Sequence, residues 1–545
     1  MKRRLAAALI AFFLLAGSAQ AEVAWRDNDD LPIAEPAEDP EGDRIWWDGT
    51  WSMTYYQLRK ILDLGLSLHT LGEWTHVVSP REATNVNALD EAPDSTWFTN
   101  RHALHPLSAE ELARWPARIK APATDGPLVI VSGKGNGMTP GFIMKDAKGD
   151  RYVVKFDASD YPEVATGAEV VCTKILHALG WNVPENYLVR FDPARLTIDE
   201  KAWIKDEYDR KHPFTQTDLT ELLKYPAREK DGRLRALASR YIAGTPKGPF
   251  RTLGLRPDDP NDTVPHEDRR ELRGLRVAAA WINYTDGRRG NFFDSFVKDE
   301  GAGEGRGHLV HYFLDFSNAL GSGNDDWKSP QYGHEYFFDP PKVLLRLVTL
   351  GFVRPAWASV PLLHPALGYF DAETFDPKEW VTSYPQPLFD PATVRDSFWG
   401  AKLVASIRDS DLRAIVGTGE WSDPTAAEKL FEVLRERQRK IASAYFDWRR
   451  INPADQFSVA DGELRYRDLA VESGVADRGS ARYRFRRPGA PWRTTETLEA
   501  ALESETVELE TSHDGGEHWS PTTAVTVAND ESGGTQVIRI ERDTD

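Results

Sequence analysis

Residues 281–292 read Trp-Ile-Asn-Tyr-Thr-Asp-Gly-Arg-Arg-Gly-Asn-Phe, which places Asp286 and Asn291 five positions apart. An apolar run, residues 309–314, follows them and ends in a second acid, Asp315. Phosphoryl transfer from a nucleotide needs these residue types in this order. One Asp orients the attacking hydroxyl, while the Asn and the second Asp hold Mg²⁺ over the phosphates. The sequence therefore predicts a phosphoryl-transfer site on Asp286, Asn291 and Asp315.

The chain before this stretch carries the signals of strands joined by turns. Strands are predicted at residues 127–131, 142–145 and 151–156. A helix over residues 166–179 follows and ends at Gly180, the residue type that favours the left-handed backbone after a helix. A further strand over 182–189 completes the order strand, strand, strand, helix, strand, which is typical of the small lobe of a kinase.

Two charged residues of this region are candidates for the same site. Lys155 ends a predicted strand, where a kinase keeps the lysine that binds the α- and β-phosphates; an ordinary edge-strand lysine would look the same. Glu169 lies one turn into the following helix, where it could pair with Lys155. Thr166 and Glu169 also have the spacing of a capping box, which would satisfy the helix start without catalysis. The sequence leaves both roles of Glu169 open.

A glycine-rich loop, residues 132–141, separates the first two predicted strands. Its backbone N–H groups could cover phosphates, with Gly135, Gly137 and Gly141 as the predicted cofactor-binding glycines. The loop is not a Walker A motif, and Pro140 stands where the pattern G-x-G-x-x-G needs its third glycine. A simple hairpin is the alternative interpretation.

Arg288 follows Asp286 by two residues and is placed to neutralise a transferred phosphoryl group.

At these residues the chain resembles the atypical kinases of the protein-kinase-like superfamily, in particular the HipA-like and CotH-like branches. Those proteins carry an Asn-x-x-Asp-x-x-x-x-Asn-like loop, which residues 283–291 match. The resemblance spans about residues 127–450 and implies ATP and Mg²⁺ as cofactors. It implies the following roles: Lys155 binds phosphate, Glu169 orients Lys155, Asp286 is the base, and Asn291 and Asp315 are metal ligands. The chain departs from the pattern at Arg288, where His or Lys is expected, and at Ser317, which replaces the Gly of Asp-Phe-Gly.

The first residues read as a secretory signal peptide. Three basic residues precede an apolar run over 5–16, and Ala19-Gln20-Ala21 forms a cleavage site. A periplasmic or secreted protein beginning at Glu22 is therefore predicted. The whole chain also resembles a group of exported bacterial proteins of unassigned function, through residues 85–100 and 396–448. Cys172 is the only cysteine, so no internal disulfide is possible.

Charge and hydropathy narrow the range of partners. The chain has 85 acidic and 67 basic residues, a net charge of −18 that argues against nucleic acid and anionic membrane as general partners. No apolar run after the leader reaches 18 residues, so no transmembrane segment is expected in the mature chain. The closest run, Val343–Phe370, is interrupted by Arg346 and Arg354, and we predict that it forms buried core.

The predicted fold class is α+β: a two-lobed protein-kinase-like fold with an N-terminal extension and a C-terminal all-β module. The predicted boundaries are 1–21 for the signal peptide, 22–126 for the extension, 127–195 for the small lobe, 196–452 for a mainly helical large lobe, and 453–545 for a β-sandwich-like module. Within the last module, residues 512–519 resemble an Asp-box, a tight hairpin in which the Asp binds the turn backbone.

Three functions remain open from the sequence. The first is an exported kinase that transfers a phosphoryl group, or AMP, to a hydroxyl of an unknown protein or small molecule. The second is an inactive kinase-like scaffold that binds an envelope protein or glycan, which suits an exported protein because ATP is scarce outside the cytoplasm. The third is a hydrolase or lectin built on the Asp-box, although one box cannot make a propeller.

Overall fold

The computed structural model describes residues 23–38, 54, 56, 80–115, 121–134, 139–206, 210–529 and 533–544. The predicted signal peptide, Gly135 and Gly137 lie outside these ranges. Helices and sheets are mixed, so the predicted α+β class is confirmed. The chain divides into two compact units. The larger contains the described residues of 27–85 and 94–445; the smaller contains those of 86–93 and 446–544, with those before 27.

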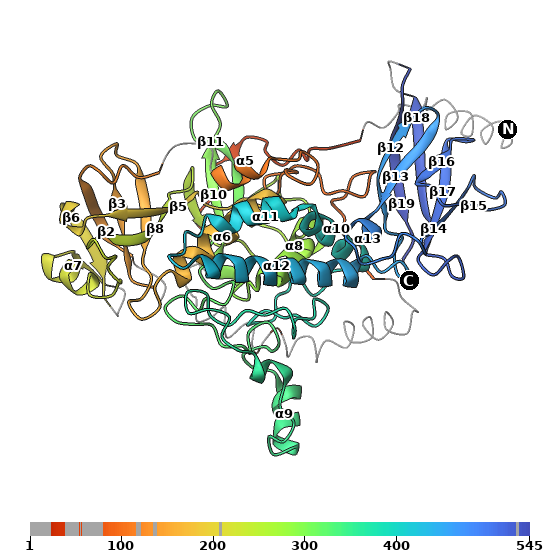
Figure 1. Ribbon diagram of the computed structural model, residues 1–545. Helices are drawn as coiled ribbons and strands as arrows, with labels where there is room; N and C mark the ends of the chain where they lie inside the picture. The colour runs from red at the N-terminus through yellow and green to blue at the C-terminus, as the bar shows by residue number, and fades with distance from the viewer. Residues whose placement is uncertain are drawn as a thin grey trace. The chain divides into compact units, whose positions relative to one another are not determined.

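The larger unit contains a seven-stranded sheet with the order β5-β8-β4-β3-β2-β6-β7 (Figure 1). Buried side chains such as Tyr152 and Val154 alternate along the central strand and form an apolar core on one face. The sheet continues past residue 195, the predicted end of the small lobe, to Arg240. Its strands are β2 (Leu128–Gly133), β3 (Gly141–Lys145), β4 (Arg151–Lys155), β5 (Asn186–Phe191), β6 (Leu196–Lys205), β7 (Lys211–Pro213) and β8 (Leu234–Arg240), with the short helix α7 (Gln216–Leu222) after β7.

Helix α6 (Val164–Leu179) follows β4 and packs against β5. It begins two residues before the predicted start, and its Thr166 is therefore not the capping residue. Instead, Oδ1 of Asp157 accepts hydrogen bonds from the backbone N–H groups of Ala165 and Thr166 at 2.8 and 2.9 Å. The capping box is thus not formed, which leaves Glu169 available for another partner. The helix ends at Gly180 with a φ of 128°, as predicted.

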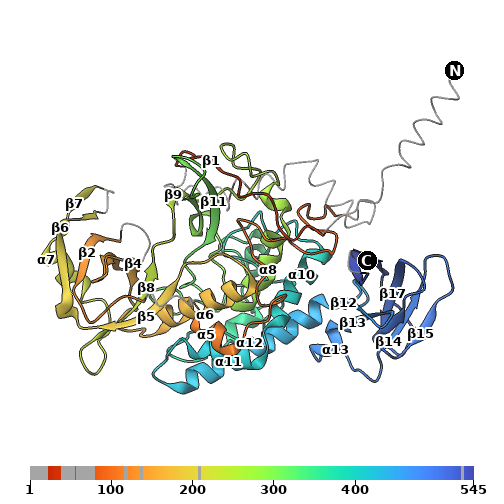
Figure 2. The ribbon, with the colours of Figure 1, turned by 90° about the horizontal axis from the view of Figure 1, so that it is seen from above.

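Four helices of the remaining larger unit pack on one another (Figure 1). The same part of the chain also contains a second sheet, so residues 196–452 are less helical than predicted; Figure 2 labels three of its strands, β1, β9 and β11. The helices are α8 (Arg270–Ile282), α10 (Val394–Ser406), α11 (Asp409–Gly417) and α12 (Pro424–Tyr445), with α5 (Ala109–Arg114) packed on α11. The sheet order is β1 (Ile33–Ala34), β11 (Arg306–Phe313), β10 (Phe292–Lys298) and β9 (Thr245–Gly248).

The run predicted to be buried core differs from the prediction over most of its length. Leu367 and Phe370 are buried, but helix α9 (Pro340–Val348) buries none of its side chains. The prediction is therefore wrong for residues 343–353. Hydrophobicity indicates that a surface favours removal from water; it does not say whether the chain itself or a partner covers it. None of the helices in the described ranges is long and apolar enough to cross a bilayer.

The smaller unit contains two antiparallel sheets and a one-turn helix, α13 (Leu469–Glu472). The segment Val86–Pro93 belongs to this unit, and the N–H of Ile540 donates to the carbonyl of Ala88 at 2.8 Å. Asp514 accepts hydrogen bonds from two turn N–H groups, as the Asp-box pattern predicts. The sheets are β12 (Ala454–Ala460), β13 (Glu463–Asp468), β16 (Glu499–Ala501), and β15 (Arg493–Thr495), β14 (Arg482–Arg486), β17 (Thr506–Ser512), β18 (Thr523–Asn529), β19 (Thr535–Arg542).

Candidate phosphoryl-transfer site

Lys155 forms ion pairs with two carboxylates of the candidate site, Glu169 and Asp315. Its Nζ donates to Oε2 of Glu169 at 3.1 Å and to Oδ1 of Asp315 at 2.9 Å. The side chains of Lys155 and Glu169 are 12% and 2% exposed, so this ion pair is poorly hydrated, whereas Asp315 is 36% exposed and keeps one side toward solvent. Burial acts against the ammonium charge, but the Asp315 and Glu169 carboxylates outweigh it and raise the pKa of Lys155. A lysine held in this way stays protonated and suits a phosphate oxygen.

The sheet fixes the position of Lys155. Strand β4 is central in the sheet, between β3 and β8, and Lys155 pairs with Gly141. A side chain on Gly141 would collide with the carbonyl oxygen of Val154, so glycine is required here by strand packing. The predicted role of Gly141 in phosphate binding stays a prediction, and that of Gly135 and Gly137 lies outside the described residues.

Glu169 is oriented by its own helix and by the next strand. Its side chain is 2% exposed, and burial raises the pKa of its carboxyl in spite of Lys155. Nδ2 of Asn186, the first residue of β5, donates to Oε1 of Glu169 at 3.4 Å and to Oγ1 of Thr173 at 2.9 Å. These contacts hold Glu169 toward Lys155. The pairing interpretation of Glu169 therefore fits the structure better than the capping-box interpretation.

The hairpin of β10 and β11 brings the two predicted metal ligands together. Phe292 pairs with Phe313 at its open end, and the N–H of Leu314 donates to the carbonyl of Asn291 at 2.9 Å. Asn291 and Asp315 thus emerge side by side from neighbouring strand ends, although they are far apart in the sequence. The Tyr284 hydroxyl donates to the Leu314 carbonyl at 3.0 Å and ties the loop after α8 to the same place.

Asp286 lies on that loop, which begins where Asn283 ends α8 in the left-handed conformation. Nδ2 of Asn291 donates to Oδ2 of Asp286 at 3.0 Å and to its backbone carbonyl at 2.8 Å. Nε of Arg288 lies 3.1 Å from Oδ1 of Asp286. Burial raises the pKa of the Asp286 carboxyl, which Arg288 opposes and the Asp315 charge reinforces. A carboxylate with a raised pKa is a better acceptor for a hydroxyl proton near neutral pH.

The donor set fits a divalent cation. Oδ1 of Asp315 accepts from Lys155 and, at 2.6 Å, from the Ser317 hydroxyl, while no described residue donates to Oδ2. Desolvation works to raise the pKa of Asp315, but Lys155 and Ser317 outweigh it, so the pKa falls well below its usual range. Asn291 uses its amide nitrogen on Asp286, which leaves Oδ1 as its ligand atom. Carboxylate and amide oxygens of this kind are what Mg²⁺ prefers.

Two lysines near the site, the half-buried Lys134 and the buried Lys328, were not singled out from the sequence. Lys134 follows β2, and its Nζ donates to the Thr139 carbonyl at 2.9 Å. Burial, followed by the Lys155 charge, lowers the pKa of Lys134 to about 8. Its place in the glycine-rich loop was the available signal. Nζ of Lys328 donates to the carbonyls of Asn283, at 3.1 Å, and Asn318, at 2.7 Å, and so supports the loop that carries Asp286. Lys328 lies in no motif.

Lys328 should make the stability of the protein depend on pH. Burial lowers the pKa of Lys328 to about 7, whereas an unfolded lysine titrates near pH ~10.4. Between these values the unfolded chain binds more protons, so the free energy of unfolding should rise with pH, by at most ~1.4 kcal/mol per pH unit. Urea unfolding at about pH 7 and about pH 9 should show this rise in the wild type and a smaller one in Lys328→Met. The exposed Lys201→Met serves as the matched control and should retain the full rise. Equal pH dependence in Lys328→Met and the wild type would contradict the assignment.

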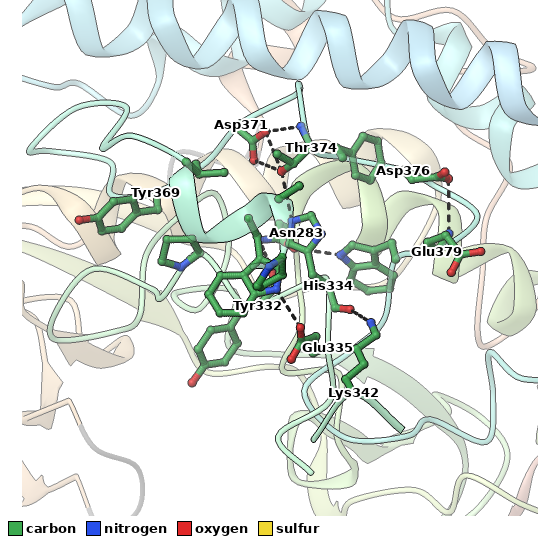
Figure 3. A pocket seen from close by; sticks show the side chains of 18 of the residues that line it. Asn283, Tyr332, His334, Glu335, Lys342, Tyr369, Asp371, Thr374, Asp376 and Glu379 are labelled. Carbon is green, nitrogen blue, oxygen red and sulfur yellow. Dashed lines mark hydrogen bonds between the residues drawn. The ribbon is translucent and has the colours of Figure 1, made fainter. Parts of the chain in front are cut away.

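A cavity of about 290 Å³ lies elsewhere, between α9 and the loops before and after it (Figure 3). Asn283 is among its lining residues, but Lys155, Glu169, Asp286, Asn291 and Asp315 are not. Within the described ranges, the predicted site residues therefore gather at a place distinct from this cavity. The Asp371–Thr374 hydrogen bonds seen in Figure 3 belong to the cavity and not to the candidate site.

Comparisons with known proteins give a weak similarity to kinases. No protein-family model matches the sequence, and the search of curated proteins finds no match. The Helicobacter pylori proinflammatory kinase CtkA is similar over 57% of this chain and 92% of its own, with 14% identity and a TM-score of 0.31. The Golgi casein kinase is similar over 76% of this chain and 94% of its own, with 10% identity and a TM-score of 0.30, and its form with Mn and ADP bound gives 0.29. Similarity at this level assigns no activity, so the side-chain contacts above are the basis for a functional proposal.

Proposed function

We propose that the chain is a kinase-like phosphotransferase that uses Mg·ATP to modify a hydroxyl of a protein or small molecule. The observation that supports this most directly is the bridge from Glu169 through Lys155 to Asp315, with Asp286 and Asn291 hydrogen-bonded beside it. Protein kinases require both the Lys–Glu ion pair and the metal-binding Asp in place. In this proposal the seven-stranded sheet with α6 is the small lobe and the helices from α8 to α12 form most of the large lobe.

Each residue has a defined task in the proposed reaction. Lys155 binds the α- and β-phosphate oxygens, and Glu169 keeps it oriented. Asn291 and Asp315 would hold Mg²⁺, which neutralises phosphate charge when bound. Asp286 accepts the hydrogen of the attacking hydroxyl and orients its oxygen toward the phosphorus. Arg288, whose guanidinium lies next to Asp286, offsets negative charge on the group being transferred.

Two features of the proposal extend beyond the site. The same residues would serve transfer of AMP, since both reactions place metal and lysine on the phosphates and differ in which phosphorus is attacked. The signal peptide predicted over residues 1–21 supports the proposal that the protein is exported to the periplasm or beyond. Export would place the enzyme where ATP is scarce, so the competing outcome of the test below is an inactive scaffold that does not respond to nucleotide.

The melting temperature with and without Mg·ATP tests nucleotide binding. Ligand at ~100-fold over its Kd should add about 2.7 kcal/mol of apparent stability to the wild type. The Asp315→Asn variant should lose this gain, because the substitution removes the carboxylate that would bind the metal. Asp192→Asn is the matched control, since Asp192 is exposed and only caps a short 3₁₀ turn. No gain in the wild type at millimolar Mg·ATP would overturn the proposal in favour of a scaffold that binds an envelope protein or glycan.

A further inference from the structure

The segment from Phe337 to Val353 concentrates exposed apolar surface to an unusual degree. It contributes ten of the 15 large hydrophobic side chains that are exposed in the described chain. Leu347, Val348, Leu350 and Phe352 are 69, 72, 81 and 88% exposed. An apolar patch of this kind on a folded protein marks a contact with a partner or a membrane. We call residues 340–354 the arm and residues 347–353 its tip.

The base of the arm is firmly held. Glu335 is buried, and its carboxylate accepts hydrogen bonds from the Arg346 guanidinium and, at 2.9 Å, from Nε1 of Trp357. The Lys342 ammonium donates to the His334 carbonyl, an interaction visible at the rim of the cavity in Figure 3. These contacts anchor the arm on both sides of the tip. Figure 1 shows α9 standing away from the other helices of its unit.

The tip is a defined turn. The N–H of Gly351 donates to the Arg346 carbonyl at 2.9 Å, and the N–H of Phe352 donates to the Thr349 carbonyl at 2.9 Å. Gly351 and Leu350 both have positive φ, at 77° and 49°, so the chain reverses tightly there. The backbone groups of the tip are thus partly satisfied internally, which lowers the cost of moving it into an apolar medium.

The charges of this segment distinguish between possible partners. Residues 340–363 contain Lys342, Arg346 and Arg354 but no acidic residue, in a chain whose acidic residues outnumber its basic ones by 85 to 67. The tip carries no charge and is framed by Arg346 and Arg354. Arg346 is already paired with Glu335 and Lys342 with Asp339, so the exposed Arg354 is the charge that the segment presents to a partner. Two tips packed on one another would bring the two copies of Arg354 close together. A bilayer with anionic lipids accommodates both parts, because acyl chains accept the apolar tip and headgroup phosphates accept the exposed Arg354.

We propose that the arm inserts its tip into the interface of an anionic phospholipid membrane and so tethers the larger unit to it. Helix α9 has nine residues and is therefore about 14 Å long, enough to reach the ~5–10 Å depth at which interfacial segments lie. The remaining surface keeps its negative charge, which disfavours close contact elsewhere and makes the attachment local. This inference does not depend on the phosphotransferase proposal, because none of the proposed catalytic residues belongs to the arm.

An environment-sensitive fluorophore on the tip tests the tether directly. Cys172 is the only cysteine and is buried, so Phe352→Cys in the full chain places an NBD label at the tip alone. Vesicles of equimolar phosphatidylcholine and phosphatidylglycerol should shift its emission to the blue and increase it. The same label on Lys201→Cys, an exposed position of β6, should not respond. Arg354→Glu in the tip-labelled protein changes the charge by two units. It should therefore weaken vesicle binding about 25-fold, since each unit of charge near such a surface changes binding roughly fivefold.

The readout separates this proposal from its competitors. Binding through the leader would leave the tip label unshifted and would overturn the proposal, as would a tip label that stays unshifted at lipid excess. A blue shift that grows with protein concentration in the absence of vesicles, with dimers detected by light scattering, would assign the arm to a second copy of the chain instead. Equal responses of the Phe352→Cys and Lys201→Cys labels would indicate non-specific adsorption and would also overturn it.

Discussion

Replacing Asp286 by Asn should lower the rate of phosphoryl transfer by about 10²–10⁴-fold, the usual effect of removing a general base. The substitution keeps the size of the side chain but only one of its two oxygens, so the side chain can accept from Asn291 or from Arg288 and not from both. The bond from Asn291 to the backbone carbonyl of residue 286 remains, so the loop should retain its shape. The substitution removes the Asp286 carboxyl group, whose pKa is raised by burial and by the charge of Asp315. Transfer of the γ-phosphoryl group of labelled ATP to water or to a generic acceptor protein measures this rate.

The Asp286→Asn protein also separates catalysis from binding. Asp286 is not a proposed metal ligand, so Mg·ATP should still raise the melting temperature of this variant as it does for the wild type. Asp192→Asn should transfer phosphate at the wild-type rate. If Asp286→Asn retained full activity, Asp286 could not be the base; if it lost the thermal shift, its role would be to build the nucleotide site.

Replacing Lys155 by Met should destabilise the protein by roughly 3–5 kcal/mol, the cost of removing one partner of a buried ion pair. Glu169 would be left almost fully buried without its counter-charge, and Asp315 would lose one of its two donors. Glu169 could escape only by taking up a proton. The deficit measured by urea unfolding should therefore shrink as the pH falls toward the ordinary pKa of glutamate.

A double replacement isolates the cause of that loss. Glu169→Gln in the Lys155→Met background removes the buried charge but still offers an oxygen to Asn186, so it should recover much of the lost stability. Recovery of stability without recovery of Mg·ATP binding is the expected result. A double variant as unstable as Lys155→Met alone would show that the loss arises from packing around Lys155 and not from the ion pair.

The sequence predicts the local elements of the site well, because they depend on short-range chemistry. The strand before Lys155, the helix that carries Glu169 and its end at Gly180 all follow from alternation, periodicity and glycine. The predicted order of these elements also places Lys155 and Glu169 close enough to pair. What the sequence could not decide was which partner Glu169 takes, since the cap of that helix comes from Asp157, a residue outside the capping pattern.

The parts that could not be predicted depend on long-range contacts. Lys328 reaches the loop of Asp286 from a region without regular structure, and no local pattern announces a buried lysine there. The exposed arm was predicted wrongly for a different reason. Its leucines and valines have the pattern of a core segment, and only the tertiary structure shows that nothing in the described chain covers them. Composition indicates how much apolar surface a chain carries. It does not indicate whether the chain itself, another protein or a membrane covers that surface.

The place of Val86–Pro93 in the smaller unit has a consequence for how the protein is made. The strand that carries Ile540 and Arg542, the hydrogen-bond and ion-pair partners of this segment, is translated about 450 residues after it. At ~5–20 residues per second, the segment waits roughly 20–90 s before those partners exist. The smaller unit therefore assembles only after residue 542 has been synthesised. A protein truncated after Tyr445 would keep an orphaned segment near its beginning, open to proteases and to aggregation.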